Sequence, residues 1–198
     1  MLSSINRGAA RLVAAAIGFL ATIVFLGSGN VIGFVFVFVA PYLAIVIHEL
    51  GHATAAWING MHVIEISAGP LALRTRPLRF GPSETFLGRD VGGHVLHDES
   101  RGRYLTRTAD RWIIAGGPLA NLATFAVCYG VGWLGADTTE VRLMMGFALA
   151  SLAAFVLSAW PHRLNSGRGN DAAQFLRTFE FRSPLKPKRP ARSPWQAP

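Results

Sequence analysis

Residues 41–57, PYLAIVIHELGHATAAW, place three polar side chains, His48, Glu49 and His52, inside an apolar run. Ionisable side chains are costly in a membrane-spanning segment, and they mark functional sites where they occur. On a helix, residues i and i+4 lie on one face, so both imidazoles can bind one metal ion. The neighbouring glutamate can then act as the base for an attacking water. The pattern His-Glu-x-x-His therefore predicts a single metal site, and zinc suits its nitrogen and oxygen donors.

The composition indicates an integral membrane protein. Of the 198 residues, 51% are hydrophobic and only 15% are charged, whereas soluble domains carry about a quarter charged residues. Four apolar blocks approach or exceed the roughly 20 residues that cross a bilayer; they are residues 9–27, 31–57, 112–134 and 143–160. We expect an all-α polytopic fold with about four transmembrane helices. The first block also resembles a signal peptide, but its length and the lack of an Ala-x-Ala-like site favour a retained span.

Basic residues alternate along the chain in the way that the positive-inside rule requires. Arg7 and Arg11 precede the first block, eight Arg lie in residues 58–111, and eight Lys or Arg follow Pro161. The other two connections carry only Arg142. This pattern predicts that both termini and the histidine pair lie on the cytoplasmic side. It also accounts for the net charge of +8, so we expect no nucleic-acid partner, and the compact size indicates a bacterial inner membrane.

The segment between the second and third blocks is not a span. Its stretch HVIEIS, residues 62–67, alternates apolar and polar side chains, which is typical of a short strand. We expect a small membrane-associated β-hairpin or sheet there, and a strand of this kind could pair with an unwound substrate by β-augmentation. We predict a single membrane domain over residues 1–180. Residues 181–198 are rich in proline and basic residues, which predicts a disordered cytoplasmic tail.

A catalytic zinc site needs a third protein ligand. The candidates are acidic residues near the cytoplasmic face and the remaining four histidines: His62, His94, His97 and His162. Asp171 begins an amphipathic run, DAAQFLRTF, after the last apolar block. The Asn-Asp pair at its start is also typical of a helix N-cap, so spacing alone leaves the role of Asp171 open. The single cysteine, Cys128, excludes a disulfide within the chain and a cysteine-based metal cluster.

Several separate stretches in residues 31–180 resemble the site-2 protease family of intramembrane zinc metalloproteases. HELGHA resembles its zinc-binding helix, ISAGPLAL and GGHV its membrane-associated strands, and AGGPLAN its next span. SAWP and the later GND resemble its Asn-x-x-Pro stretch and its Asp-Gly motif. The resemblance implies that Asp171 is the third zinc ligand. Two positions depart from the family pattern: Ser158 stands where Asn is frequent, and Ala172 where Gly is usual.

Asn121 ends the AGGPLAN stretch and has two interpretations. An amide inside an apolar span most often bonds another helix. The resemblance implies instead that Asn121 lies near the active site and contacts substrate.

The resemblance implies a zinc endopeptidase that hydrolyses membrane proteins, single-span ones above all, near the cytoplasmic face. One Zn²⁺ would be held by His48, His52 and Asp171, with Glu49 as the catalytic base. The alternative is a non-catalytic metal-binding membrane scaffold, which would have no need of Glu49. A small transporter with an ion relay is a third interpretation, but the four predicted spans show no evident repeat.

Overall fold

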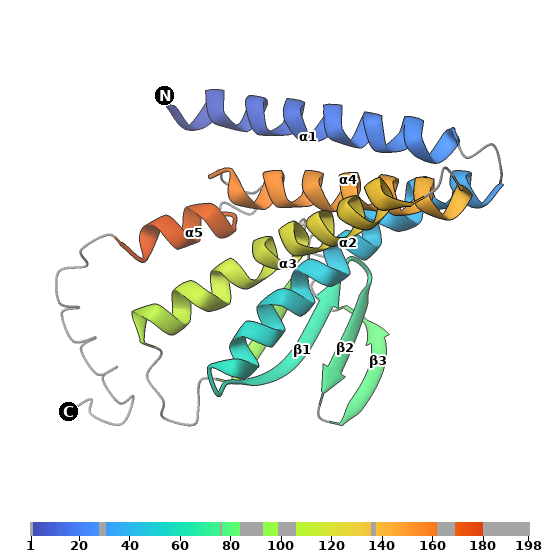
Figure 1. Cartoon of the computed structure of the whole chain (residues 1–198). Coiled ribbons are helices and arrows are strands. Elements are labelled where there is room, and N and C mark those ends of the chain that lie inside the picture. The colour runs from blue at the N-terminus through green and yellow to red at the C-terminus, as the bar shows by residue number, and fades with distance from the viewer. Residues whose placement is uncertain are drawn as a thin grey trace, which may run out of the picture.

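The computed structural model describes residues 2–27, 31–75, 77–83, 93–98, 106–135, 138–161 and 169–179. The chain is mostly helical, with a small sheet between its second and third long helices (Figure 1). The helices are α1 (Leu2–Leu26), α2 (Val31–Ile58), α3 (Arg107–Leu134), α4 (Thr139–Ala159) and α5 (Asp171–Arg177). The strands are β1 (His62–Ala68), β2 (Leu71–Thr75), β3 (Leu78–Pro82) and β4 (Gly93–Asp98). This confirms the expected mostly helical fold with an inserted sheet; the predicted tail and His162 lie outside the described residues.

Three helices in the described part of the chain, α2, α3 and α4, are long and apolar enough to cross a membrane. At about 1.5 Å per residue, a helix as long as α2 extends for roughly 42 Å and exceeds the hydrocarbon core of about 30 Å. The apolar part of α1, Leu12–Leu26, is shorter. The chain is therefore a membrane protein with three helices that meet the requirement for a span, where the sequence predicted about four.

Helix α1 packs along α4, as Figure 1 shows. Phe25 is only 2% exposed, and its ring fills the space that a side chain at Gly146 of α4 would occupy. Ala21, Ala40 and Ala150 complete this small core between α1, α2 and α4. Small residues of this kind let membrane helices approach closely, so dispersion contacts can hold them together.

The sheet is antiparallel throughout and has the strand order β3-β2-β1-β4. Gly69, with φ of 54°, makes the tight turn from β1 to β2. Strand β1 contains HVIEIS and confirms the predicted strand, but it lies inside the sheet with a partner on each side. The expectation that HVIEIS itself could receive a substrate strand is therefore wrong, because both of its edges are already paired. Strand β4 is an edge strand among the described strands, and it contacts α2.

Helices α2 and α3 cross at two glycines. A Cβ atom on Gly51 would collide with the Gly116 carbonyl, and one on Gly116 would collide with Gly51 and Ala55. Only glycine at both positions lets the two backbones approach this closely. The contact lies within the HELGH motif of α2 and within the GGPLAN stretch of α3, so the crossing presses the histidine face of α2 onto α3.

Candidate metal centre

The structure brings His48, His52 and Asp171 together. The Nε2 atom of His48 lies 2.8 Å from Asp171 Oδ2 and 3.1 Å from His52 Nε2. His52 Nε2 lies 3.5 Å from the same carboxylate oxygen. Within the described ranges, this is the group of three histidine, cysteine or acidic side chains that could hold a metal ion. Two ligands come from one turn of α2, and the third comes from α5, far along the chain.

The other ring nitrogens of the two histidines are held from α3. His52 Nδ1 lies 2.7 Å from the Ile113 carbonyl, which can only accept, so this nitrogen donates there and a neutral ring would offer its Nε2 lone pair to a metal ion. The Asn121 amide nitrogen lies 3.1 Å from His48 Nδ1. If His48 binds a metal ion through Nε2, its ring proton must lie on Nδ1. Rotation of the Asn121 amide by 180° would let the amide oxygen accept a hydrogen bond from this Nδ1–H. Polar partners on α3 therefore orient both imidazoles.

Asn121 is fully buried, with 0% of its surface exposed. Its amide bonds a side chain of another helix, as the first of the two interpretations expected for an amide in an apolar span. The partner is a candidate metal ligand, so the same contact also puts Asn121 beside the site. Its side-chain oxygen has no hydrogen-bond partner among the described residues, which is consistent with an amide that turns to serve His48.

Asp171 is free to face the histidines because its neighbour caps the helix. Asn170 is the N-cap of α5, and its side-chain oxygen accepts from the Ala173 N–H. Its amide nitrogen also donates to the carbonyls of Leu157, Ser158 and Trp160, at 2.9, 2.9 and 2.8 Å. Leu157 and Ser158 lie in the last turn of α4, whose carbonyls have no donor within the helix. Asn170 thus fixes the start of α5 to the end of α4 and sets the position of Asp171.

The other end of α5 is fixed to α3. The Arg111 guanidinium donates to the Thr178 hydroxyl and to the Thr178 carbonyl, at 3.0 and 3.3 Å. It also lies over the Phe179 ring, 3.7 Å from the centroid. A helix as short as α5 has little stability of its own, so these contacts at both ends define where its carboxylate lies.

The Asp171 carboxyl has the protonation state that a ligand requires. Burial works to raise its pKa, but the adjacent His48 and His52 rings outweigh burial and lower the pKa to about 2. The carboxyl is therefore ionised at neutral pH, as metal binding demands.

The three side chains fit a zinc ion. Bonds of about 2.0 to 2.2 Å at tetrahedral angles separate two ligand atoms by about 3.3 to 3.6 Å, and the observed separations are 2.8 to 3.5 Å. A shift of a few tenths of an ångström would accommodate the ion. Gly117 keeps the space open, because a Cβ atom there would collide with the Nε2 atoms of both histidines. Two neutral imidazoles and one carboxylate are also a ligand set that zinc enzymes use.

Glu49 lies next to this site but is not one of the three close groups. It is 5% exposed, and Gly93 of β4 packs directly on its side chain. A Cβ atom on Gly93 would collide with the Glu49 carboxylate, so the edge strand fixes where this carboxylate can lie. Such a placement suits a general base, whose position must be held while the metal ligands remain undisturbed.

We predict that Gly93→Ala lowers the peptide-bond cleavage that the resemblance implies by about 10- to 100-fold, and that it leaves zinc binding intact. The added methyl displaces the Glu49 carboxylate, and misplacement by about 1 Å can reduce a rate 100-fold. Gly81→Ala in β3 is the matched control, because a Cβ atom there meets nothing within 4 Å. The measurements are the cleavage rate and the zinc content of both variants. Equal rates for the two would contradict the proposed contact.

The remaining candidates lie elsewhere or serve other contacts. His62 belongs to β1, His94 and His97 to β4, and none of them joins the group of three. The His94 ring instead shares a hydrogen bond with the Ser67 hydroxyl, which links β4 to β1 beside Gly93.

The two departures from the family pattern have local explanations. The Ser158 hydroxyl donates to the Phe155 carbonyl of its own helix, 3.0 Å away, so it does not replace an amide. Ala172 lies within α5, where helical φ and ψ angles make no demand for glycine.

A model of peptidase family M50 matches residues 34–182 of the chain. This range holds both histidines of the motif, Glu49, Asn121 and Asp171, and it leaves out the whole of α1. Comparisons with curated proteins and with solved structures gave no match.

Proposed function

The chain belongs to peptidase family M50, the site-2 protease family that its motifs resemble, and we propose that it is an intramembrane zinc endopeptidase. One observation carries the proposal. The nitrogen atoms of His48 and His52 and a carboxylate oxygen of Asp171 meet within 4.8 Å of one another, and the glutamate of the same His-Glu-x-x-His motif lies beside them. Family membership alone indicates a metallopeptidase; the geometry supports this ligand set and this base.

Each residue has a defined part in the proposed reaction. His48, His52 and Asp171 hold the ion, and the Ile113 carbonyl and Asn121 keep the two imidazoles oriented. Zinc, when bound, supplies a Lewis acid that activates water and polarises the scissile carbonyl. Glu49 accepts the proton of the attacking water and later delivers one to the leaving amine.

The proposed substrate is a membrane protein, single-span in the simplest case. A helical substrate hides its carbonyls in hydrogen bonds and must unwind before attack. Strand β4 offers an unpaired edge among the described strands and begins at Gly93, in contact with Glu49. An unwound segment added to this edge would lie next to the base. We therefore propose β4, in place of β1, as the strand that receives the substrate, because both edges of β1 are occupied.

For the orientation, we propose that both termini are cytoplasmic, on the basis of the loop charges. This requires α1 as a fourth span, and its packing along α4 through Phe25 supports that role. The ligand pair lies in the second half of α2, toward the end that this orientation places at the cytoplasmic face. Water from that side would then have a short path to Glu49.

A metal-binding scaffold without catalysis is the alternative. Such a protein needs the three ligands but has no use for a carboxylate buried beside them. Glu49 has no hydrogen-bond or ion-pair role among the described contacts, and burial of an idle carboxylate is costly. Its presence beneath β4 therefore favours the enzyme.

Reconstitution in lipid vesicles with a single-span substrate tests the proposal. We expect cleavage to stop when 1,10-phenanthroline removes the metal and to return when Zn²⁺ is added in excess, because the ion supplies the activation of water. The measurement is the appearance of cleaved fragments on a gel. Cleavage that persists in metal-free protein would contradict the zinc mechanism.

A further inference from the structure

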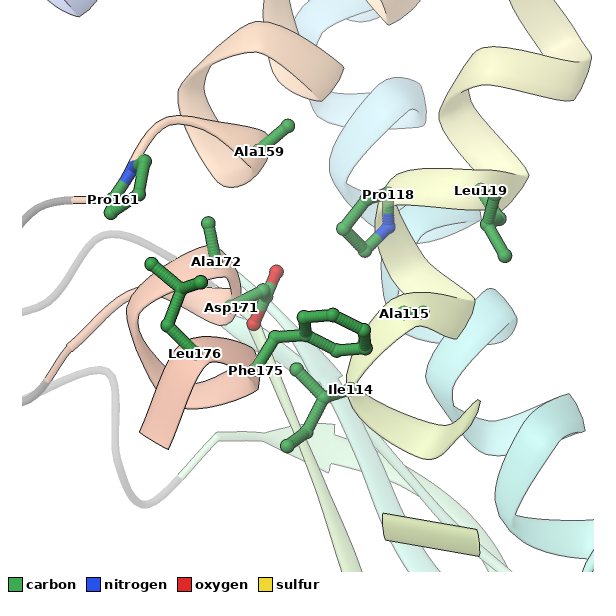
Figure 2. A pocket seen from close by; sticks show the side chains of 10 residues that line it. All are labelled: Ile114, Ala115, Pro118, Leu119, Ala159, Pro161, Asp171, Ala172, Phe175 and Leu176. Carbon is green, nitrogen blue, oxygen red and sulfur yellow. The ribbon is translucent and has the colours of Figure 1, made fainter. Parts of the chain in front are cut away.

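A groove opens beside Asp171, between α3, the end of α4 and α5 (Figure 2). Its volume is about 280 Å³, which is below the roughly 300 to 1,000 Å³ of sites that enclose a small-molecule ligand. The size suits one large side chain better than a whole cofactor. We propose that this groove takes an apolar side chain of the substrate, the one next to the scissile bond, and thereby selects what is cut. The inference rests on the proposed peptidase function.

The groove adjoins the metal centre through one shared residue, Asp171. Asp171 contributes to its wall, and the same carboxylate lies 2.8 Å from His48 Nε2. Figure 2 shows the Asp171 carboxylate and the Phe175 ring on the α5 side, across from Pro118 on α3. Adjacent Cα atoms of a peptide are about 3.8 Å apart. A carbonyl held at the metal would therefore bring its neighbouring side chain to this opening.

The chemistry of the walls favours an apolar occupant. Every side chain that lines the groove is apolar except Asp171. The Asp171 carboxylate already faces two imidazoles, whose Nε2 atoms lie 2.8 and 3.5 Å away. A charged substrate side chain would find no partner of opposite charge beyond Asp171 among the described lining residues, and it would lose its hydration. A Leu or Phe side chain would instead gain the free energy of leaving water.

One backbone feature favours a peptide over a lipid chain. Pro118 has no N–H, so the carbonyl of Ile114, one turn earlier in α3, lacks its usual helical donor. Both residues line the groove. A substrate backbone N–H can donate to such a carbonyl, whereas an acyl chain carries no donor. The groove therefore offers a polar anchor together with an apolar pocket, which is the combination that a peptide requires.

Two amino-acid hydroxamates, of glycine and of leucine, test the inference on the zinc-loaded protein in detergent. The hydroxamate group binds zinc, and the side chain next to it probes the groove. We expect the leucine compound to bind about 10-fold tighter or better by calorimetry, the gain that burial of such a side chain provides. Neither compound should bind the metal-free protein at the same site.

Three variants test whether the groove causes the preference for leucine hydroxamate over glycine hydroxamate. Ala159→Phe at the end of α4 should fill the groove, so the leucine-to-glycine affinity ratio falls toward one while glycine hydroxamate binds as before. Ala126→Phe, at an exposed position of α3 outside the groove, should leave the ratio unchanged. Phe175→Ala should enlarge the groove and raise the affinity for tryptophan hydroxamate relative to leucine, with zinc content confirming that α5 still holds its ligand.

The possible results distinguish failure of the groove proposal from failure of the proposed peptidase function. Equal affinity of the wild type for the two compounds, or a ratio that Ala159→Phe leaves unchanged, would overturn the groove proposal and leave the peptidase intact. A groove filled by a lipid acyl chain would give this result. Absence of zinc-dependent binding by either hydroxamate would overturn the proposed function and this inference with it.

Discussion

Replacement of Glu49 by glutamine is expected to reduce substrate cleavage by about 10²- to 10⁴-fold, the contribution typical of a positioned general base. The amide keeps nearly the same shape but cannot accept the proton of the attacking water. Zinc should stay bound, because Glu49 is not one of the three close ligands. The measurements are the initial cleavage rate and the zinc content of the same preparation. A lower cleavage rate at full zinc content would show that Glu49 has a catalytic role and not only a structural one.

Glu140→Gln is the control for this substitution. Glu140 lies in the first turn of α4 and is exposed, so the same chemical change there should leave cleavage unaltered. Equal activity of Glu49→Gln and the wild type would remove the enzyme interpretation and leave the metal-binding scaffold.

Gly117→Ala is expected to abolish zinc binding with the addition of one methyl group. A Cβ atom at this position would collide with the Nε2 atoms of both His48 and His52, so it would occupy space next to the ion. The zinc affinity should fall by more than about 100-fold, the upper end of the loss seen when support of a metal ligand is removed. Cleavage should be lost together with the metal. Zinc content after dialysis against a chelator of known affinity measures the effect.

Gly130→Ala on the same helix is the matched control, because a Cβ atom there meets nothing within 4 Å. It makes the same change in helix propensity without the collision. If both variants kept zinc equally, the space beside Gly117 would not be the metal position.

The HELGH stretch predicted its own part of the site well. A strong local pattern needs only the 3.6-residue period of a helix to place His48 and His52 on one face, and α2 places them so. The apolar blocks likewise predicted the positions of α2, α3 and α4, because a bilayer demands long apolar helices. The status of α1 was harder to predict, since its apolar part is shorter than the helix that contains it.

Contacts between distant segments could not be predicted from periodicity. Asp171 was ambiguous in the sequence because Asn-Asp is typical of an N-cap, and only the structure assigns the cap to Asn170. The tethering of α5 by Arg111 also depends on the packing of α5 against α3. The order of the strands was likewise hidden, so HVIEIS appeared available although β4 covers its second edge.

The glycines left the weakest signal. Gly117 stands within GGPLAN and Gly93 within GGHV, so both lay inside stretches that resemble the family. Their importance comes from the side chain that they lack, which matters only where another residue approaches. A glycine pair in a predicted span could have indicated a close helix crossing, but not which side chains it would bring together.

The zinc content of a purified Asp171→Ala variant tests the central claim most directly, because Asp171 joins the two helical histidines to a distant part of the chain. The account predicts one zinc per chain in the wild type and far less than one in the variant after equilibration with a competing chelator. Full zinc occupancy in the variant, with activity retained, would contradict it and would show that another residue completes the site.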